Sequence, residues 1–148
     1  MANQSGRTVI ITGASSGIGL QAALALAAKG AYVIAAVRNP AKGRAVLGDA
    51  ADIRTMDLAD LDSVRHFAST IDRDVDVLVN NAGVMAVPLA RTAQGFELQI
   101  GTNHLGHFAL TGLLLPRITN RVVTVSSTAH RMGRIRLDDL NWNLPSST

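Results

Sequence analysis

Cysteine is absent from the 148 residues, which excludes disulfides and cysteine-bound metals. Aromatic residues make up only 3% of the chain, and Tyr32 is its single tyrosine. Because 47% of the residues are nonetheless hydrophobic, alanine, valine, isoleucine and leucine must fill the core. Aliphatic cores of this kind are typical of buried parallel strands covered by helices. The composition therefore favours one α/β domain over residues 1–148.

Two further absences concern location and partners. The first seven residues, MANQSGR, lack the apolar segment of a signal peptide, and the most apolar stretch, 20–37, is interrupted by polar residues and a glycine. We therefore expect a cytoplasmic protein without a membrane span. The net charge is +3, but the basic residues are scattered, apart from Arg131, Arg134 and Arg136, and are not interleaved with aromatics. We expect no nucleic-acid partner.

Strand-like and helix-like segments alternate along the chain. Short aliphatic runs predict strands at Thr8–Thr12, Tyr32–Val37, Ile53–Met56, Val75–Val79 and Arg121–Ser126. The segments between them predict helices at Gly17–Lys29, Ala41–Leu47, Leu61–Ile71 and approximately Gly95–Leu115. The stretch from His130 to Thr148 is polar and is expected to be irregular. This alternation predicts a doubly wound parallel sheet (Rossmann-like) with strand order 3-2-1-4-5, whose ligands bind at the carboxyl ends of the strands.

The segment from Thr12 to Gly19, TGASSGIG, joins the first predicted strand to the first predicted helix. Its glycines leave backbone N–H groups free to face a phosphate, and the helix N-terminus adds partial positive charge. Side chains at these positions would hold off a pyrophosphate or push the helix from the strand. The turn predicts a dinucleotide-binding domain, unless it is an incidental glycine turn. Its cofactor-binding candidates are Gly13, Ser15, Ser16, Gly17, Ile18 and Gly19.

Residues after the later strands extend this predicted site. The second strand ends without an acidic residue and is followed by Arg38, which predicts NADP rather than NAD because a guanidinium pairs with a 2′-phosphate. Asp57 can accept a hydrogen bond from an adenine amino group. Asn80, Ala82 and Gly83 lie in a turn that permits close approach to a ribose. The alternatives are a solvated charge at Arg38 and ordinary turn chemistry at the other positions.

These motifs occur in the order and spacing of the short-chain dehydrogenases/reductases, which the chain resembles over nearly its whole length. The resemblance rests on the glycine turn, Asp57-Leu58, Asn80-Asn81-Ala82-Gly83, Asn103 and Val123-x-Val125-Ser126-Ser127. The segment from Thr92 to Phe108 is similar to the retinol dehydrogenase and protochlorophyllide reductase branch. The resemblance implies hydride transfer between a nicotinamide and a carbonyl or alcohol, with a hydrophobic substrate in this branch. It also adds Leu58 to the cofactor site.

The catalytic residues that the resemblance implies are incomplete in this chain. Ser127 matches the serine that binds the substrate oxygen, and Asn103 matches the asparagine that anchors a water of the proton relay. A turn serine and a helix-kink asparagine are the alternatives. The family's Tyr-x-x-x-Lys pair is missing, since Tyr32 is followed four residues later by Ala36. We therefore expect an N-terminal portion that lacks the family's C-terminal strands and helices and is inactive alone.

Other functions stay open at this level. A non-catalytic NADP(H)-binding module would share the glycine turn and Arg38, and a basic nucleic-acid binder is a weaker alternative. His104 and His107 could suit a metal, but no third ligand stands at a compatible spacing, so we expect a structural role and no metal site. Met85 and Val87 could line a substrate pocket or pack within their loop. A homo-oligomer is also left open.

Overall fold

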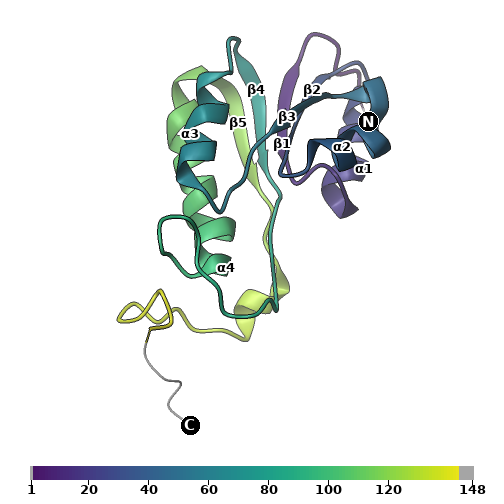
Figure 1. Cartoon of the computed structure of the whole chain (residues 1–148). Helices are drawn as coiled ribbons and strands as arrows, with labels where there is room; N and C mark the ends of the chain where they lie inside the picture. The colour runs from purple at the N-terminus through teal and green to yellow at the C-terminus, as the bar shows by residue number, and fades with distance from the viewer. Residues whose placement is uncertain (1, 144–148) are drawn as a thin grey trace.

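The computed structural model, which describes residues 2–143, contains a parallel sheet between two helical layers (Figure 1). The strands are β1 (Thr8–Thr12), β2 (Tyr32–Val37), β3 (Asp52–Thr55), β4 (Val75–Asn80) and β5 (Ile118–Thr124). Their order in the sheet is β3-β2-β1-β4-β5, and every neighbouring pair is parallel. The predicted fold class and strand order are confirmed. The expectation of irregular structure at residues 144–148 lies outside the described part of the chain.

Helices cover both faces of the sheet (Figure 1). Helices α1 (Gly17–Ala27) and α2 (Pro40–Leu47) lie on one face, and α3 (Leu61–Ser69) and α5 (His107–Leu114) lie on the other. Successive side chains of a strand point to opposite faces, so Ile10 packs in the α3/α5 layer while Val9 and Ile11 pack in the α1 layer. Because both faces are buried, the central strands are apolar at nearly every position.

The long helix predicted from residue 95 to residue 115 is divided into consecutive elements. They are α4 (Leu98–Ile100), the π-helix η2 (Gly101–Gly106) and α5. The first turn starts after Glu97, whose buried carboxylate accepts the N–H groups of Gln99 at 2.9 Å and Ile100 at 2.8 Å. A side chain at Gly106 would clash with the carbonyl of Leu58, so this glycine lets the helix approach the loop after β3. The helix therefore packs closely against the edge of the sheet at which the strands end and the cofactor is predicted to bind.

Strand β5 begins and ends earlier than the predicted Arg121–Ser126. Pro116 lies in the 3-10 turn η3 (Leu115–Arg117), and the strand starts directly afterwards, with Ile118 opposite Val75. The polar residues at its start are tolerated because β5 is an edge strand with one side open to water. Two other short 3-10 turns are η1 (Gly48–Ala50) and η4 (Thr128–Arg131).

The segment after β5 runs past the end of the sheet near α4 (Figure 1). The guanidinium of Arg91 donates to the carbonyl of Asn141 and, at 2.9 Å, to the side-chain oxygen of Asn143. The N–H of Glu97 donates to the side chain of Asn141 at 3.0 Å. These bonds fix the segment to the loop before α4. Among the described residues, no helix is long and apolar enough to cross a membrane.

Candidate cofactor site

A cavity of about 160 Å³ lies at the carboxyl ends of four neighbouring strands, β3, β2, β1 and β4. Its lining comes mainly from the residues that end or follow these strands: Gly13, Ser15, Ala36, Val37, Arg38, Met56, Asp57, Leu58, Ala82, Gly83, Val84 and Thr102. Parallel strands deliver their following loops to the same edge of a sheet, and here the strand order reverses between β1 and β4. The structure thus brings together predicted residues from every part of the proposed site: Gly13, Ser15, Arg38, Asp57, Leu58, Ala82 and Gly83.

The glycine turn is required by contact as well as by backbone conformation. Gly13 has a φ of +68°, and a Cβ there would lie 2.9 Å from the Cα of Ala82. A Cβ at Gly19 would lie 2.7 Å from the carbonyl oxygen of Gly13. Gly17 has a φ of +55° but meets nothing within 4 Å, so its glycine is explained by conformation alone. The turn is packed on its inner side and open on its outer side.

The first turn of α1 is suited to an anion. Ser16 is the N-cap residue, but its side chain makes no capping hydrogen bond, and the first turn contains no acidic residue. The first N–H groups of the helix consequently have no side-chain partner. Ile18 is 72% exposed on the same turn, where an apolar side chain has no core to bury it. These features fit a bound pyrophosphate, with Ile18 free to pack against the cofactor.

Thr12 ties the glycine turn to the turn after β4. Its buried hydroxyl oxygen accepts the N–H groups of Asn81 and Ala82, each at 2.9 Å. The side-chain amide of Asn81 donates to the carbonyl of Thr12 at 2.9 Å. Asn80 lies outside the cavity, and its amide donates to the hydroxyl of Thr111 at 3.0 Å. The structure therefore places Asn80 behind the turn, while Ala82 faces the cavity.

Arg38 and Asp57 differ in the number of hydrogen bonds that they form within the protein. The exposed side chain of Arg38 lines the cavity and forms no hydrogen bond or ion pair within residues 2–143. One carboxylate oxygen of Asp57 accepts the N–H of Ala59 at 2.9 Å. This bond is the turn interaction that the sequence offered as the alternative role of Asp57. The other oxygen has no partner in the described structure, and Asp57 also lines the cavity. Both sites hold an unused polar group for a ligand.

The implied catalytic residues Asn103 and Ser127 have different surroundings. The side chain of Asn103 accepts the N–H of Val84 at 2.8 Å and donates to the carbonyl of Val84 at 2.8 Å. Asn103 lines a separate cavity of about 300 Å³, which also includes Asn80 and Phe108. Ser127 follows β5, is exposed, and accepts the N–H of Ala129 at 3.2 Å. Within the described chain, Ser127 lines neither of these two cavities.

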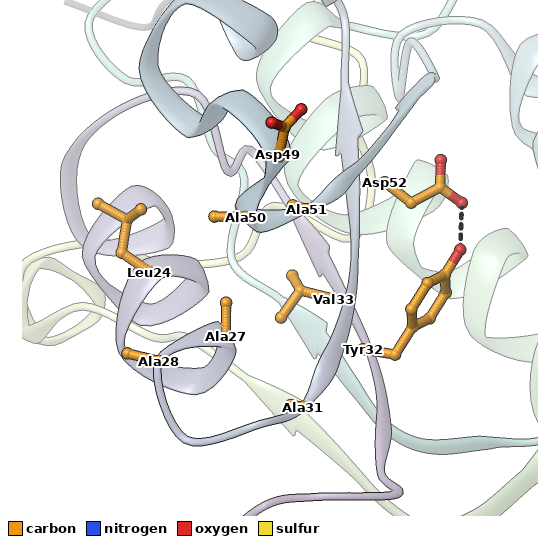
Figure 2. Close-up of a pocket in the computed structure, with 10 residues that line it drawn as sticks. All are labelled: Leu24, Ala27, Ala28, Ala31, Tyr32, Val33, Asp49, Ala50, Ala51 and Asp52. Atoms are coloured by element: carbon orange, nitrogen blue, oxygen red, sulfur yellow. Dashed lines mark hydrogen bonds between the residues drawn. The ribbon is translucent and has the colours of Figure 1, made fainter.

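Tyr32 lies at the opposite end of the sheet. A cavity of about 650 Å³ lies there. Figure 2 draws the residues that line it: Leu24, Ala27, Ala28, Ala31, Tyr32, Val33, Asp49, Ala50, Ala51 and Asp52. The Tyr32 hydroxyl donates to the carboxylate of Asp52 at 2.9 Å. Partial burial acts to raise the pKa of Asp52, but hydrogen bonds from Arg54 and Tyr32 hold it below its ordinary value. Tyr32 starts β2, whereas the cofactor candidates follow the strand ends, so it is remote from the predicted chemistry.

Sequence reasoning missed the role of the Thr12 hydroxyl and of His107. The His107 ring is buried, with one nitrogen 2.9 Å from the Thr12 hydroxyl and the other 3.0 Å from the carbonyl of Asn103. The available signal was a histidine four residues after Asn103 on a helix, where side chains lie over the preceding turn. No cluster of three or more metal-ligating side chains occurs among residues 2–143.

Known proteins resemble this chain in both sequence and structure. Residues 7–138 match the family model described as short chain dehydrogenase. Human retinol dehydrogenase 13 is 47% identical over 93% of this chain and 46% of its own length. Human retinol dehydrogenase 11 is 43% identical over 91% of this chain and 47% of its own length. The chain thus spans about half the length of the curated relatives it matches.

Solved structures agree with these sequence matches. An uncharacterized protein from Mycobacterium paratuberculosis superimposes with a TM-score of 0.93 at 58% identity, over 97% of this chain and 54% of that one. A short chain dehydrogenase/reductase family protein superimposes with a TM-score of 0.74 at 34% identity, over 89% of this chain and 60% of that one. The chain therefore belongs to the short-chain dehydrogenase/reductase family and is similar to the retinol dehydrogenases within it.

Proposed function

We propose that this chain binds NADP and forms the cofactor half of an oxidoreductase that transfers hydride between the nicotinamide and a hydrophobic carbonyl or alcohol. The observation that carries the proposal is the cavity in which the glycine turn meets residues from three further strand ends. Family membership supports a nicotinamide dinucleotide, and relatives named retinol dehydrogenase support a hydrophobic alcohol or aldehyde.

Each part of the candidate site, that is, the cavity and the first turn of α1 next to it, has a role in this proposal. The unpartnered N–H groups at the start of α1, with Ser15, would bind the pyrophosphate. Arg38 would pair with the 2′-phosphate, and the free oxygen of Asp57 would accept the adenine amino group. The backbone at Ala82 and Gly83 would lie against a ribose. The bound nicotinamide would supply or accept the hydride.

The substrate side is the less complete part of the site. The Ser127 oxygen accepts the N–H of Ala129 and keeps its own O–H free to donate to a substrate oxygen. Asn103 is held in place by both bonds to Val84. The 148 residues contain no Tyr-x-x-x-Lys, so in this proposal they bind the cofactor and contact the substrate oxygen but do not supply the proton donor. The same absence favours, as second candidate, a non-catalytic NADP(H)-binding module.

The NADP preference is tested at Arg38. The substitution Arg38→Asp replaces a cation beside the 2′-phosphate with an anion, so NADPH should bind at least about tenfold more weakly while NADH binds equally or better. Fluorescence or calorimetric titrations with both cofactors measure the two affinities. Arg117→Asp is the matched control, because Arg117 lies at the amino end of β5, away from the cavity. An unchanged ratio of NADPH to NADH affinity in Arg38→Asp would refute the preference.

The two candidate functions differ in turnover. We expect protein expressed from the complete reading frame to oxidise NADPH in the presence of a hydrophobic aldehyde. NADPH binding without turnover of any carbonyl or alcohol by that protein would instead support the non-catalytic module. Loss of both binding and turnover would contradict the two candidates together.

A further inference from the structure

His107 is a buried histidine at the start of α5, the helix that packs behind the glycine turn. It is 5% exposed, and it lies between the end of β1 and the π-helix η2. One ring nitrogen, Nε2, is 2.9 Å from the Thr12 hydroxyl oxygen, and the other, Nδ1, is 3.0 Å from the backbone oxygen of Asn103. Both ring nitrogens thus have a hydrogen-bond partner. Which nitrogen carries a proton follows from whether each partner donates or accepts.

The partners allow one arrangement of protons. The Thr12 oxygen already accepts N–H groups from Asn81 and Ala82, so its two lone pairs are used. Its own hydrogen must therefore be donated, and Nε2 at 2.9 Å is a better acceptor than the carbonyl of Val79 at 3.5 Å. The Asn103 carbonyl can only accept, so Nδ1 carries the ring proton. The ring is neutral.

Protonation of this ring would break the arrangement. A proton on Nε2 would face a Thr12 oxygen that already receives two N–H donors, and no acceptor would remain for the hydroxyl hydrogen at a normal distance. Burial lowers the pKa of His107, the neighbouring His104 adds to this effect, and the bond to Asn103 opposes it.

Within residues 2–143, the elements packed against the ring contribute mainly uncharged side chains. Helix α3 turns Val64, Phe67 and Ala68 into the core shared with α5. The charged residues of α3 are exposed. Strand β1 contributes Thr12, and β4 contributes Asn80, which bonds Thr111 on α5. His104 is therefore the titratable group to consider beside His107.

We infer that His107 is a positioning residue. Its ring, neutral and protonated on Nδ1, holds the π-helix that carries Asn103 against the glycine turn by its bond to Thr12. The chain of bonds runs from Asn103 through His107 and Thr12 to the N–H groups of Asn81 and Ala82. Ala82 lines the cofactor cavity. The effect on cofactor binding rests on the proposed function, whereas the tautomer and the bond network do not.

The tautomer is tested in the wild-type chain without cofactor. Two-bond proton–nitrogen correlation spectra of ¹⁵N-labelled protein should show His107 with a protonated Nδ1 and an unprotonated Nε2 at neutral pH. The amides of Asn81 and Ala82 should be strongly protected from hydrogen exchange, and their protection factors, which are corrected for the intrinsic pH dependence of exchange, should fall as the pH drops through the His107 pKa. A ring protonated on Nε2, or protection factors that do not change with that titration, would overturn the inference.

Variants separate positioning from simple packing. His107→Gln can place an acceptor near the Nε2 position, and His107→Phe keeps a planar ring, somewhat larger than histidine, with neither donor nor acceptor. We expect His107→Phe to weaken NADPH binding roughly tenfold and His107→Gln to recover most of the loss, because the Thr12 bond returns. His66→Gln on the exposed face of α3 is the matched control.

The pH profile gives the second readout. Wild-type affinity for NADPH should fall as the pH drops through the His107 pKa, and His107→Phe should lack this step, while titration of the cofactor's own phosphate is common to both. An identical profile in wild type and His107→Phe would overturn the inference. If no form binds NADPH, the proposed function fails, and the tautomer and amide exchange still decide the role of His107.

Discussion

At the scale of single residues, identical amino acids hold their positions for different reasons. Gly19 and Gly112 both lie within helices, where glycine is unfavourable for stability. A Cβ at Gly19 would come within 2.7 Å of the Gly13 oxygen and would also clash with the amide of Asn81. A Cβ at Gly112 would meet nothing within 4 Å. Only Gly19 is required by the packing of the cofactor turn.

The two glycines therefore provide a matched pair of substitutions. Gly19→Ala should lower the free energy of unfolding by about 1–3 kcal/mol, because it forces α1 away from the turn. Gly112→Ala should raise it by roughly 0.5–1 kcal/mol through the better helix propensity of alanine. Urea unfolding followed by circular dichroism measures both. Equal effects of the two substitutions would contradict the packing explanation.

At the scale of elements, the start of α3 is joined to the loop that leads into α4. The carboxylate of the N-cap residue Asp60 accepts the N–H of Asp62 at 2.9 Å and the side-chain amide of Gln94 at 3.1 Å. The Gln94 oxygen accepts the N–H of Leu61 at 3.0 Å. The bonds from Gln94 and from the Asp62 N–H lower the pKa of Asp60 below its ordinary value of 3.8.

The stability that Asp60 contributes should depend on pH. Because its folded pKa is lowered, the contribution is present above the unfolded pKa and is lost as the pH falls through the folded pKa. Asp60→Ala should lower the unfolding free energy at neutral pH, and this difference from wild type should shrink in acid. Urea unfolding across a pH series measures it, with Asp49→Ala on the exposed turn η1 as control. A difference that is constant with pH would rule out the charged cap.

At the scale of the whole molecule, the β5 side of the sheet is open. Strand β5 forms an edge, and the valines Val123 and Val125 at its end are 41% and 43% exposed. Phe108 and Leu115, in or next to α5, are also exposed large apolar side chains. An edge strand with one side unpaired, beside apolar side chains, is a site at which further chain can pair.

This edge predicts the behaviour of the isolated 148-residue chain. We expect it to associate with itself in a concentration-dependent way and to turn over no carbonyl with NADPH, since it has no Tyr-x-x-x-Lys. Val123→Lys should reduce the association, whereas Val46→Lys, at a 39% exposed position on α2, should not. Light scattering coupled to size-exclusion chromatography measures the mass. A monomer at every concentration, or turnover of an aldehyde, would contradict this expectation.

The fold was predictable because its signals are local. Aliphatic runs identify the central strands, and the glycine turn identifies the junction of β1 and α1. The ends of β5 and the π-helix η2 were not predictable, because they depend on Ile118 pairing with Val75 and on Gly106 approaching Leu58. Such contacts join residues far apart in the chain, and the hydrophobic periodicity within one segment does not reveal them.

The sequence by itself determined the strand order, the glycine turn and the family. The reason is that alternating apolar segments and the spacing of the glycines can be read along the chain without knowledge of tertiary contacts. Only the tertiary structure decided which candidates meet. It joined Arg38, Asp57 and Ala82 in one cavity, placed Asn80 behind the turn, and left Ser127 out of the lining of that cavity and of the one that Asn103 lines. It also gave the buried His107 ring partners on both sides. The physical reason is that hydrogen-bond partners across a sheet are set by packing, and no spacing along the chain encodes them.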